Sequence, residues 1–187
     1  MSPSAHRASL APLGLEVARA EALAAYLDLV ERWSPRVNLT GARTPEERVA
    51  VLVAPILPAL PALVGAFDLI DLGSGNGSPG LVLAVLSPGL RVRLLEPRGR
   101  RWAFLREAAR VVGAVGVEVL RERHDQHRGP AATRLSLRAL RLPLAELAPL
   151  LQPGGRLLSW GPAWEPRPGW SLLTQTPGFQ VLERRFT

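Results

Sequence analysis

The sequence contains no cysteine, so disulfide bonds and thiolate metal sites are excluded. It has only three histidines (His6, His124 and His127), and we expect no metal site to be built from them. It also lacks any run of about 18 uncharged apolar residues, the length that a membrane-spanning helix requires. The first residues contain no unbroken apolar stretch of the signal-peptide type. These absences predict a soluble, cytoplasmic protein without a membrane partner.

Lysine is absent as well, and all 23 basic residues other than histidine are arginine. They outnumber the 16 acidic residues and give a formal net charge of +7. Such an excess of positive charge favours an acidic partner, for example the phosphates of a nucleic acid. The same excess arises in a GC-rich genome, which enriches arginine, alanine and proline together. Composition alone therefore leaves both interpretations open.

The first third of the chain has the hydrophobic spacing of helices. Apolar residues recur at three- and four-residue steps from Leu15 to Trp33 and predict one helix there. Thr44 and Glu47 match the pattern of a capping box, so we expect a second helix to begin at Thr44. Prolines at positions 55, 58 and 61 lack an N–H donor and should kink or end that helix. Residues 1–64 are therefore predicted to form a helical cap.

Strand-like and helix-like segments alternate after residue 66. The predicted strands are residues 67–71, 91–96, 117–120, 134–140 and 156–160. The predicted helices are residues 80–86, 100–113 and 143–151, and candidate segments at 170–173 and 178–186 follow a loop over 161–170. This alternation predicts an α/β fold with a doubly wound, mainly parallel sheet. We expect a single domain of residues 1–187, with the α/β core over residues 66–187.

The stretch LIDLGSGNGSPG, residues 69–80, places four glycines and a proline directly behind an apolar strand. A strand, a glycine loop and a helix bind nucleotide-like ligands at the carboxyl end of a parallel sheet. The spacing here is D-x-G-x-G-x-G, from Asp71 through Gly73, Gly75 and Gly77. A dinucleotide fingerprint needs glycine where Ser78 stands, and a P-loop needs a Gly-Lys-Ser/Thr ending. The loop therefore favours S-adenosylmethionine, whose methionine and ribose parts need bare backbone beside them.

Glu96 ends the second predicted strand, 25 residues after Asp71. An acidic side chain at this place accepts hydrogen bonds from the two vicinal hydroxyls of a ribose. We therefore interpret Glu96 as the ribose-binding residue. The alternative is a tight turn that holds no ligand, with Glu96 on the surface.

Four stretches of the chain, taken in order, resemble the bacterial 16S ribosomal RNA guanine-N7 methyltransferase family, also called glucose-inhibited division protein B. They are ERWSPRVNLTGARTPEE, DLGSGNGSPGLVLAVLSPGLRVRLLEPRGRRWAFLRE, SLRAL and LAPLLQPGGRLLSWG. The pair Pro79 and Gly80 is more specific to this family than the other glycines. The resemblance implies a fold of the class I S-adenosylmethionine-dependent methyltransferase type. It also implies S-adenosylmethionine as donor and the 16S RNA of the small ribosomal subunit as acceptor.

By position, the resemblance makes Gly73 and Ser78 cofactor-contacting residues and places His124 and Asp125 near the adenine. For the latter two, a solvated loop is the alternative. Arg138 matches the arginine of the family's Arg-Ala-Val element. The predicted cofactor-binding set is Asp71, Gly73, Ser74, Gly75, Gly77, Ser78, Glu96, His124, Asp125 and Arg138. Guanine N7 has a free lone pair, so methyl transfer needs no general base and we predict no catalytic residue.

Arginines also follow several of the predicted strands. Because these loops share one edge of a doubly wound sheet, we expect a rim of arginines that binds RNA phosphates. The predicted rim consists of Arg98, Arg100, Arg101 and Arg141, with Arg121, Arg123, Arg128, Arg134 and Arg138 as further members. Three tryptophans near the same side serve either core packing or stacking on a base, namely Trp160, Trp164 and Trp170.

The chain departs from the family pattern at positions that concern the acceptor. Leu52, Ala54 and Pro55 stand where the family carries a histidine and a Leu-Asp-Ser motif. Trp160 replaces a lysine, and Ser78 replaces an aromatic residue or leucine. Three functions therefore remain open: N7 methylation of 16S RNA, methylation of another RNA or a small molecule, and a silent domain that binds RNA or protein. The sequence does not give the modified nucleotide or the oligomeric state.

Overall fold

The computed structural model describes residues 4–165 and 167–186. Its helices are α1 (Ala5–Leu10), α2 (Val17–Val37), α3 (Pro45–Leu52), α4 (Gly80–Leu86), α5 (Gly99–Val111) and α6 (Leu144–Leu147). Its 3₁₀ segments are η1 (Ala11–Leu13), η2 (Ala54–Leu63), η3 (His124–Gln126) and η4 (Ala148–Leu150). Its strands are β1 (Asp68–Leu72), β2 (Arg91–Leu95), β3 (Val117–Leu120), β4 (Ala132–Arg138), β5 (Leu151–Trp160), β6 (Trp170–Thr176) and β7 (Phe179–Arg184).

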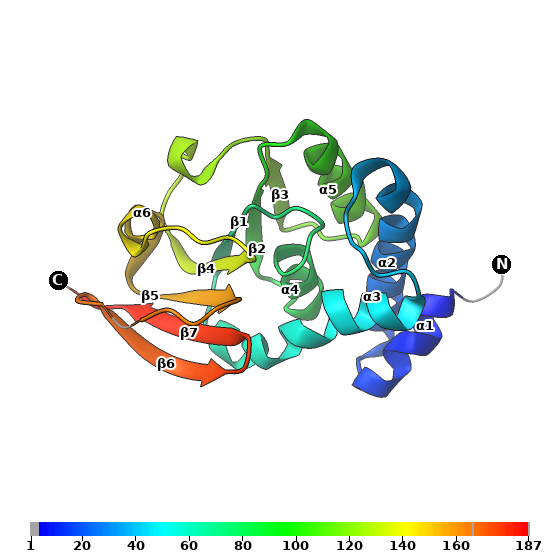
Figure 1. The fold of residues 1–187 in the computed structure, drawn as a ribbon, viewed down its shortest axis with the longest axis horizontal. Coiled ribbons are helices and arrows are strands. Elements are labelled where there is room, and N and C mark those ends of the chain that lie inside the picture. Colours follow the sequence, from blue (N-terminus) through cyan, green and yellow to red (C-terminus); the bar gives the residue numbers. More distant parts are fainter. Residues whose placement is uncertain (1–3, 166, 187) are drawn as a thin grey trace.

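The described strands form one sheet in the order β3-β2-β1-β4-β5-β7-β6 (Figure 1). Neighbours from β3 to β5 are parallel, whereas β7 runs antiparallel to β5 and β6 antiparallel to β7. The chain builds one half of the sheet with β1, β2 and β3 and then returns to place β4 on the other side of β1. The carboxyl ends of β1 and β4 therefore flank a topological switch point, where open α/β sheets bind ligands. The predicted doubly wound, mainly parallel sheet is confirmed.

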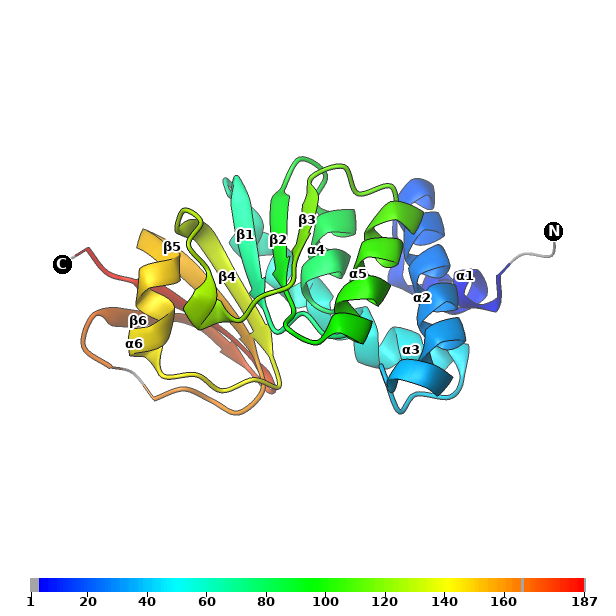
Figure 2. The same ribbon diagram turned by 90° about the horizontal axis from the view of Figure 1, so that it is seen from above.

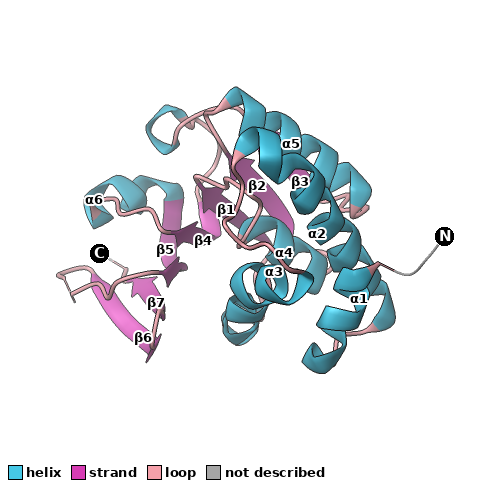
Figure 3. Cartoon of the chain, turned by 45° about the vertical axis from the view of Figure 1, so that its right-hand side comes forward, coloured by secondary structure: helices cyan, strands magenta, loops and turns pink. Residues whose placement is uncertain are grey.

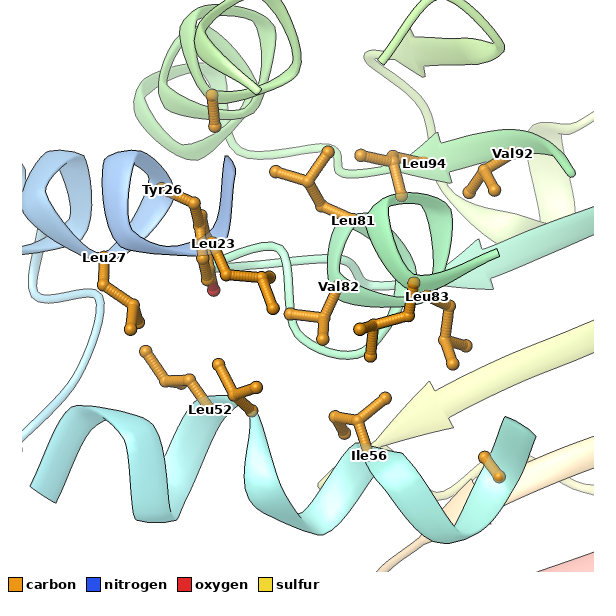
Figure 4. Close-up of a cluster of buried hydrophobic side chains, with 14 of the residues drawn as sticks. Leu23, Tyr26, Leu27, Leu52, Ile56, Leu81, Val82, Leu83, Val92 and Leu94 are labelled. Atoms are coloured by element: carbon orange, nitrogen blue, oxygen red, sulfur yellow. The ribbon is translucent and has the colours of Figure 1, made fainter. Parts of the chain in front are cut away.

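One face of the sheet carries the larger core. Figure 2 shows α4, α5 and α2 side by side next to β1, β2 and β3. In Figure 4, Tyr26 of α2 meets Leu81 and Val82 of α4, with Leu52 and Ile56 from α3 and η2 below them. All five side chains are 0–1% exposed. This core joins the N-terminal helices to the sheet, and the single domain with a helical cap stays a prediction.

The opposite face has a thinner cover. Its core consists mainly of leucines from β4, β5 and α6, together with Trp170 of β6. Figure 3 shows α1 to α5 gathered on one side of the molecule, and α6 with the strands β5, β6 and β7 on the other. None of the helices in the described residues is both long and apolar enough to span a membrane.

Local sequence signals explain most of the element boundaries. The predicted capping box is present: the Thr44 hydroxyl accepts from the Glu47 N–H at 3.1 Å, and the Glu47 carboxylate accepts from the Thr44 N–H at 3.3 Å. The α-helix ends at Leu52, and the proline-rich segment continues as the 3₁₀ segment η2 rather than as an α-helix. The strand predicted at residues 156–160 is longer in the structure, because β5 already begins at Leu151, which pairs with Ala132 across an irregularity between β4 and β5.

Candidate active site

The glycine loop, residues 73–79, connects β1 to α4 at the switch point. Gly73, Gly75 and Gly77 have φ angles of +65°, +53° and +93°. This left-handed region is strained for residues that carry a Cβ, so the tight turn requires glycine. The Ser74 hydroxyl stabilises the turn by donating to the Asp71 carbonyl at 3.0 Å.

Glu96, directly after β2, holds the loop in place. It is 3% exposed, so the alternative of a surface Glu96 is wrong. Its Oε2 accepts from the Gly75 N–H at 3.0 Å, and its Oε1 accepts from the Arg98 N–H at 2.8 Å. A carboxylate offers about four lone-pair sites, so each oxygen can accept one more hydrogen bond. The arrangement fits a ligand with vicinal hydroxyls, and the predicted ribose contact stays a prediction.

Asp71 lies beneath the loop and is fully buried. Its Oδ1 accepts from the Ser136 hydroxyl at 2.6 Å, whereas its Oδ2 has no hydrogen-bond partner among the described residues. Burial raises the pKa of Asp71 to about 6, against the opposing effect of the hydrogen bond from Ser136. A Cβ at Gly80 would lie 2.6 Å from Oδ2, so the absence of a side chain there makes room for the carboxyl group.

The N-terminal helices reach the loop directly. The Tyr26 hydroxyl donates to the Asn76 carbonyl at 2.9 Å, and the Asn76 side-chain amide donates to the Leu39 carbonyl at 3.0 Å. Sequence reasoning missed Tyr26 and Asn76. The available signal was that Tyr26, the only tyrosine, lies within an apolar helix, where a buried phenol needs a partner.

Two of the departures from the family pattern contact each other. The Ser78 hydroxyl donates to the Leu52 carbonyl at 2.7 Å and accepts from Arg138 Nη1 at 3.0 Å. Burial lowers the pKa of Arg138, and no carboxylate within the described ranges lies within 4 Å of its guanidinium. Since a guanidinium has five N–H donors, most of those on Arg138 remain available to an anion.

One side of the loop leaves room for a ligand. Gly73 is exposed, and a Cβ there would lie 3.3 Å from Leu140 Cδ2. A Cβ at Gly75 would have no atom nearer than the Gly73 carbonyl at 3.5 Å and Arg101 Nη1 at 3.8 Å. This bare backbone lies beside Glu96, and its contact with the ribose and methionine parts of S-adenosylmethionine stays a prediction.

His124 and Asp125 lie in η3, beyond β3. His124 Nε2 is 2.9 Å from Glu146 Oε2 of α6, and Asp125 accepts from Arg123 Nε at 3.1 Å. That hydrogen bond from Arg123 lowers the pKa of Asp125. Within the part of the chain that is described, no hydrogen bond joins either residue to the glycine loop, and the adenine contact stays a prediction.

The predicted arginine rim is only partly assembled. Arg98, Arg100 and Arg141 are exposed, and Arg101 donates to the Asn38 carbonyl at 3.4 Å beside the loop. Arg134 does not belong to the rim. It lies near the start of β4, at the opposite edge of the sheet.

Arg134 and Arg128 donate hydrogen bonds to backbone carbonyls and so stabilise the fold. Arg134 is 7% exposed and donates from Nε to the Ala62 carbonyl at 2.7 Å, which satisfies the end of η2. Arg128 donates to the carbonyls of Asp125 and His127 within its own loop. Sequence position alone did not reveal these backbone partners.

A family model described as rRNA small subunit methyltransferase G (GidB) matches residues 19–160. The ribosomal RNA small subunit methyltransferase G of Stenotrophomonas maltophilia (strain K279a) is 37% identical over 165 residues, which cover 88% of this chain and 72% of the relative. That of Rhodospirillum centenum (strain ATCC 51521 / SW) is 42% identical over 153 residues, 78% of this chain and 68% of the relative.

Solved structures with the same fold have little sequence identity to the chain. A mutant of MtNAS in complex with S-adenosylmethionine has a TM-score of 0.57 at 15% identity, covering 96% of this chain and 83% of that one. Coclaurine N-methyltransferase bound to N-methylheliamine and SAH has a TM-score of 0.53 at 18% identity, covering 82% and 57%. The fold is that of class I methyltransferases.

Proposed function

Because the chain belongs to the GidB family of rRNA small subunit methyltransferase G, we propose that it methylates guanine N7 in the 16S RNA of the small ribosomal subunit. The donor is S-adenosylmethionine. The observation that supports this best is the bare glycine loop at the switch point, held by the buried Glu96. As its substrate is ribosomal, we place the protein in the cytoplasm.

The chain's own residues bind and orient rather than move protons. S-adenosylmethionine, when bound, supplies an activated methyl group on its sulfonium. Gly73 and Gly75 offer backbone without side chains, and the free lone pairs of Glu96 accept from the ribose hydroxyls. The acceptor nitrogen already has a lone pair, so the site needs no general base. Catalysis then depends on holding the two reactants in the correct orientation.

Arg138 is proposed to face the acceptor side of the site. Its partly buried side chain donates to Ser78 of the glycine loop and has no carboxylate partner among the described residues. A guanidinium with free donors binds phosphate in a bidentate manner. We assign to Arg138, with the exposed Arg98 and Arg100 and the partly buried Arg101, the role of holding the RNA backbone near the cofactor.

Cofactor binding tests the first half of this function. Calorimetry with S-adenosylhomocysteine should show binding to the wild type. The Glu96→Gln variant should bind it about 1–3 kcal/mol more weakly, since it loses charged hydrogen bonds to the ribose. Glu118→Gln, at an exposed position on β3, is the matched control and should bind as the wild type does. No heat with the wild type would contradict the proposal and favour the silent domain.

Methyl transfer tests the second half. Tritiated S-adenosylmethionine should label small subunits from a strain that lacks this chain, and mass spectrometry of the RNA should find 7-methylguanosine. Large subunits from the same strain serve as the control. If the protein binds S-adenosylhomocysteine but labels neither particle, the acceptor is another RNA or a small molecule.

A further inference from the structure

A surface hollow of about 660 Å³ lies between the loops that follow β4 and β5. Its lining consists of residues 141–145 and, from the second loop, Ala163, Trp164, Glu165 and Arg167. The volume lies within the range of about 300–1,000 Å³ that is typical of small-ligand sites. Nothing in the proposed function uses this hollow.

The hollow adjoins the candidate active site. Both of its loops leave the carboxyl ends of neighbouring parallel strands, and the Ala139 N–H donates to the Trp160 carbonyl at 3.1 Å to join them. Leu140 lies over the glycine loop, 3.3 Å from the position of a Cβ at Gly73. The next residue, Arg141, lines the hollow. The hollow and the glycine loop are therefore separated by a single residue of the loop that follows β4, so an RNA strand bound in the hollow lies next to the cofactor loop.

Trp164 is held in one orientation on the wall of the hollow. Its indole N–H donates to the Ser159 hydroxyl at 2.9 Å, and its backbone N–H donates to Gln180 Oε1 at 3.0 Å. Ser159 and Gln180 are only 3% and 2% exposed. Two buried polar side chains thus fix an aromatic ring that is itself only partly buried. The indole also packs against the core cluster that includes Trp170. The part of this fixed ring that stays exposed offers a stacking surface for a nucleic-acid base.

Positive charge accompanies this ring. The exposed Arg141 guanidinium lies over the Trp164 ring, 6.0 Å from its centre, so a base that stacks on this face must displace it. It also donates to the Ala163 carbonyl at 2.7 Å. Arg167 is exposed on the same lining. Among the described residues, no carboxylate lies within 4 Å of either guanidinium, although Glu165 belongs to the lining. Both arginines therefore retain N–H donors for an anion.

We propose that this hollow binds one nucleotide of the acceptor RNA in single-stranded form, next to the methylated guanine. The base stacks on Trp164, and Arg141 and Arg167 hold the phosphates on either side. The combination of an aromatic face with guanidiniums that have no carboxylate partner among the described residues matches a nucleotide better than it matches a protein segment. The inference rests on the proposed function, because it takes the acceptor to be RNA.

A pair of tryptophan variants separates stacking from packing. Trp164→Phe and Trp164→Leu both lose the indole N–H bond to Ser159, but only phenylalanine keeps an aromatic face. The probe is a fluorescein-labelled single-stranded RNA of mixed sequence, titrated by anisotropy without cofactor. We expect Trp164→Leu to raise the dissociation constant about 5- to 100-fold, the loss of one base stack, while Trp164→Phe stays within about threefold of the wild type.

Charge variants test the phosphate contacts. Arg141→Gln and Arg167→Gln should each reduce the slope of log affinity against log salt by about 0.7, the value for one phosphate of a single strand. Arg110→Gln makes the same charge change in the last turn of α5, at the opposite edge of the sheet, and should leave the slope unchanged. Equal slopes for all three variants would overturn the proposal.

Other outcomes are equally decisive. RNA affinity that is unchanged in Trp164→Leu, or reduced to the same extent in both tryptophan variants, would overturn the stacking role. RNA affinity that is unchanged in Trp164→Leu, Arg141→Gln and Arg167→Gln alike would show that the hollow does not bind RNA and would overturn the whole proposal. Failure of the proposed function is seen separately, because S-adenosylhomocysteine binding and methyl incorporation are measured on the wild type and do not depend on the oligonucleotide.

Discussion

Gly80 has no space for a side chain, because a Cβ there would lie 2.5 Å from Leu94 Cδ2 and 2.6 Å from Asp71 Oδ2. We expect Gly80→Ala to lower the free energy of unfolding by about 1–3 kcal/mol through overpacking. Gly41→Ala is the matched control, since a Cβ at Gly41 has no atom within 4 Å. Urea denaturation measures the free energy of unfolding of both variants. An equal loss of stability in the two would show that the lack of space at Gly80 does not affect stability.

Asp71 gives the protein a specific dependence on pH. Its pKa is about 6 in the folded state, against an ordinary 3.8. The folded state therefore keeps a proton that the unfolded chain has already lost, and this contribution to stability disappears as the pH rises through about 6. The Asp71→Asn variant has no group that ionises at this position. Between pH 4 and pH 8 we expect the wild type to lose about 2–3 kcal/mol of its free energy of unfolding relative to this variant.

Denaturation of both proteins at the two pH values measures this difference, because other carboxyl groups titrate equally in each. Asp125→Asn is the control. The pKa of Asp125 is lowered by its hydrogen bond from Arg123, so any change in that variant should have the opposite sign. If the difference in the free energy of unfolding between Asp71→Asn and the wild type does not vary with pH, the pKa of Asp71 is not raised in the folded state.

At the scale of residues, the sequence predicts what local spacing encodes. Gly73, Gly75 and Gly77 were recognised because their spacing is itself the signal of a tight turn. The partner of Asp71 was not recognised, because Ser136 lies opposite it only through the register of β1 on β4. Contacts of this kind depend on strand pairing between distant segments, which a single sequence does not display.

At the scale of elements, α2 positions the cofactor loop. Tyr26 is fully buried, and its hydroxyl supplies the hydrogen bond to the Asn76 carbonyl. We expect Tyr26→Phe to keep the ring packing and the melting temperature within about 4 °C of the wild type, since one neutral hydrogen bond contributes about 1 kcal/mol. The loop loses an anchor, so the affinity for S-adenosylhomocysteine should fall about threefold to tenfold.

Calorimetry and thermal unfolding on the same samples separate the two effects. Phe104→Leu, in the core of α5, is a suitable control, since it should lower the melting temperature with little effect on ligand affinity. If Tyr26→Phe instead loses stability and keeps full affinity, Tyr26 serves the core and does not position the loop.

Element boundaries followed from the sequence where one local rule dominates. The helix at residues 80–86 and the strand at 117–120 coincide with α4 and β3. Pro79 and the Ser-Pro-Gly turn at 87–89 bound the helix, and Gly116 and the charged residues from Arg121 bound the strand. The helix predicted at 143–151 is shorter, as α6 covers only Leu144–Leu147 before η4 and β5 begin. Pairing of Leu151 with β4 outweighs the helical preference of the local sequence.

At the scale of the whole molecule, the net charge of +7 should govern RNA binding. We expect log affinity for single-stranded RNA to fall linearly with log salt, with a loss of about tenfold between 50 and 200 mM if two to three phosphates are contacted. A variant with Arg98→Gln and Arg100→Gln should show a smaller slope. Anisotropy titrations at several salt concentrations measure it, and an affinity that is independent of salt would exclude the rim as a phosphate site.

The overall architecture was predictable because alternating strands and helices leave few topologies. The distribution of charge over it was less so. Arg134 follows the same pattern of strand-linked arginines as Arg138, yet the two lie at opposite ends of β4 and have different partners. Which end of a strand a residue occupies decides its role, and the predicted strand at 134–140 lies two residues further along the chain than β4 (Ala132–Arg138).

The anchors of the glycine loop come from far along the chain. Tyr26 lies 50 residues before Asn76, and Arg138 lies 60 residues after Ser78. During synthesis on the ribosome, the loop therefore emerges before its last anchor exists and receives its full set of supports only after β4 has joined β1. Ligand capture by a growing chain would thus mark the moment at which its two halves have come together.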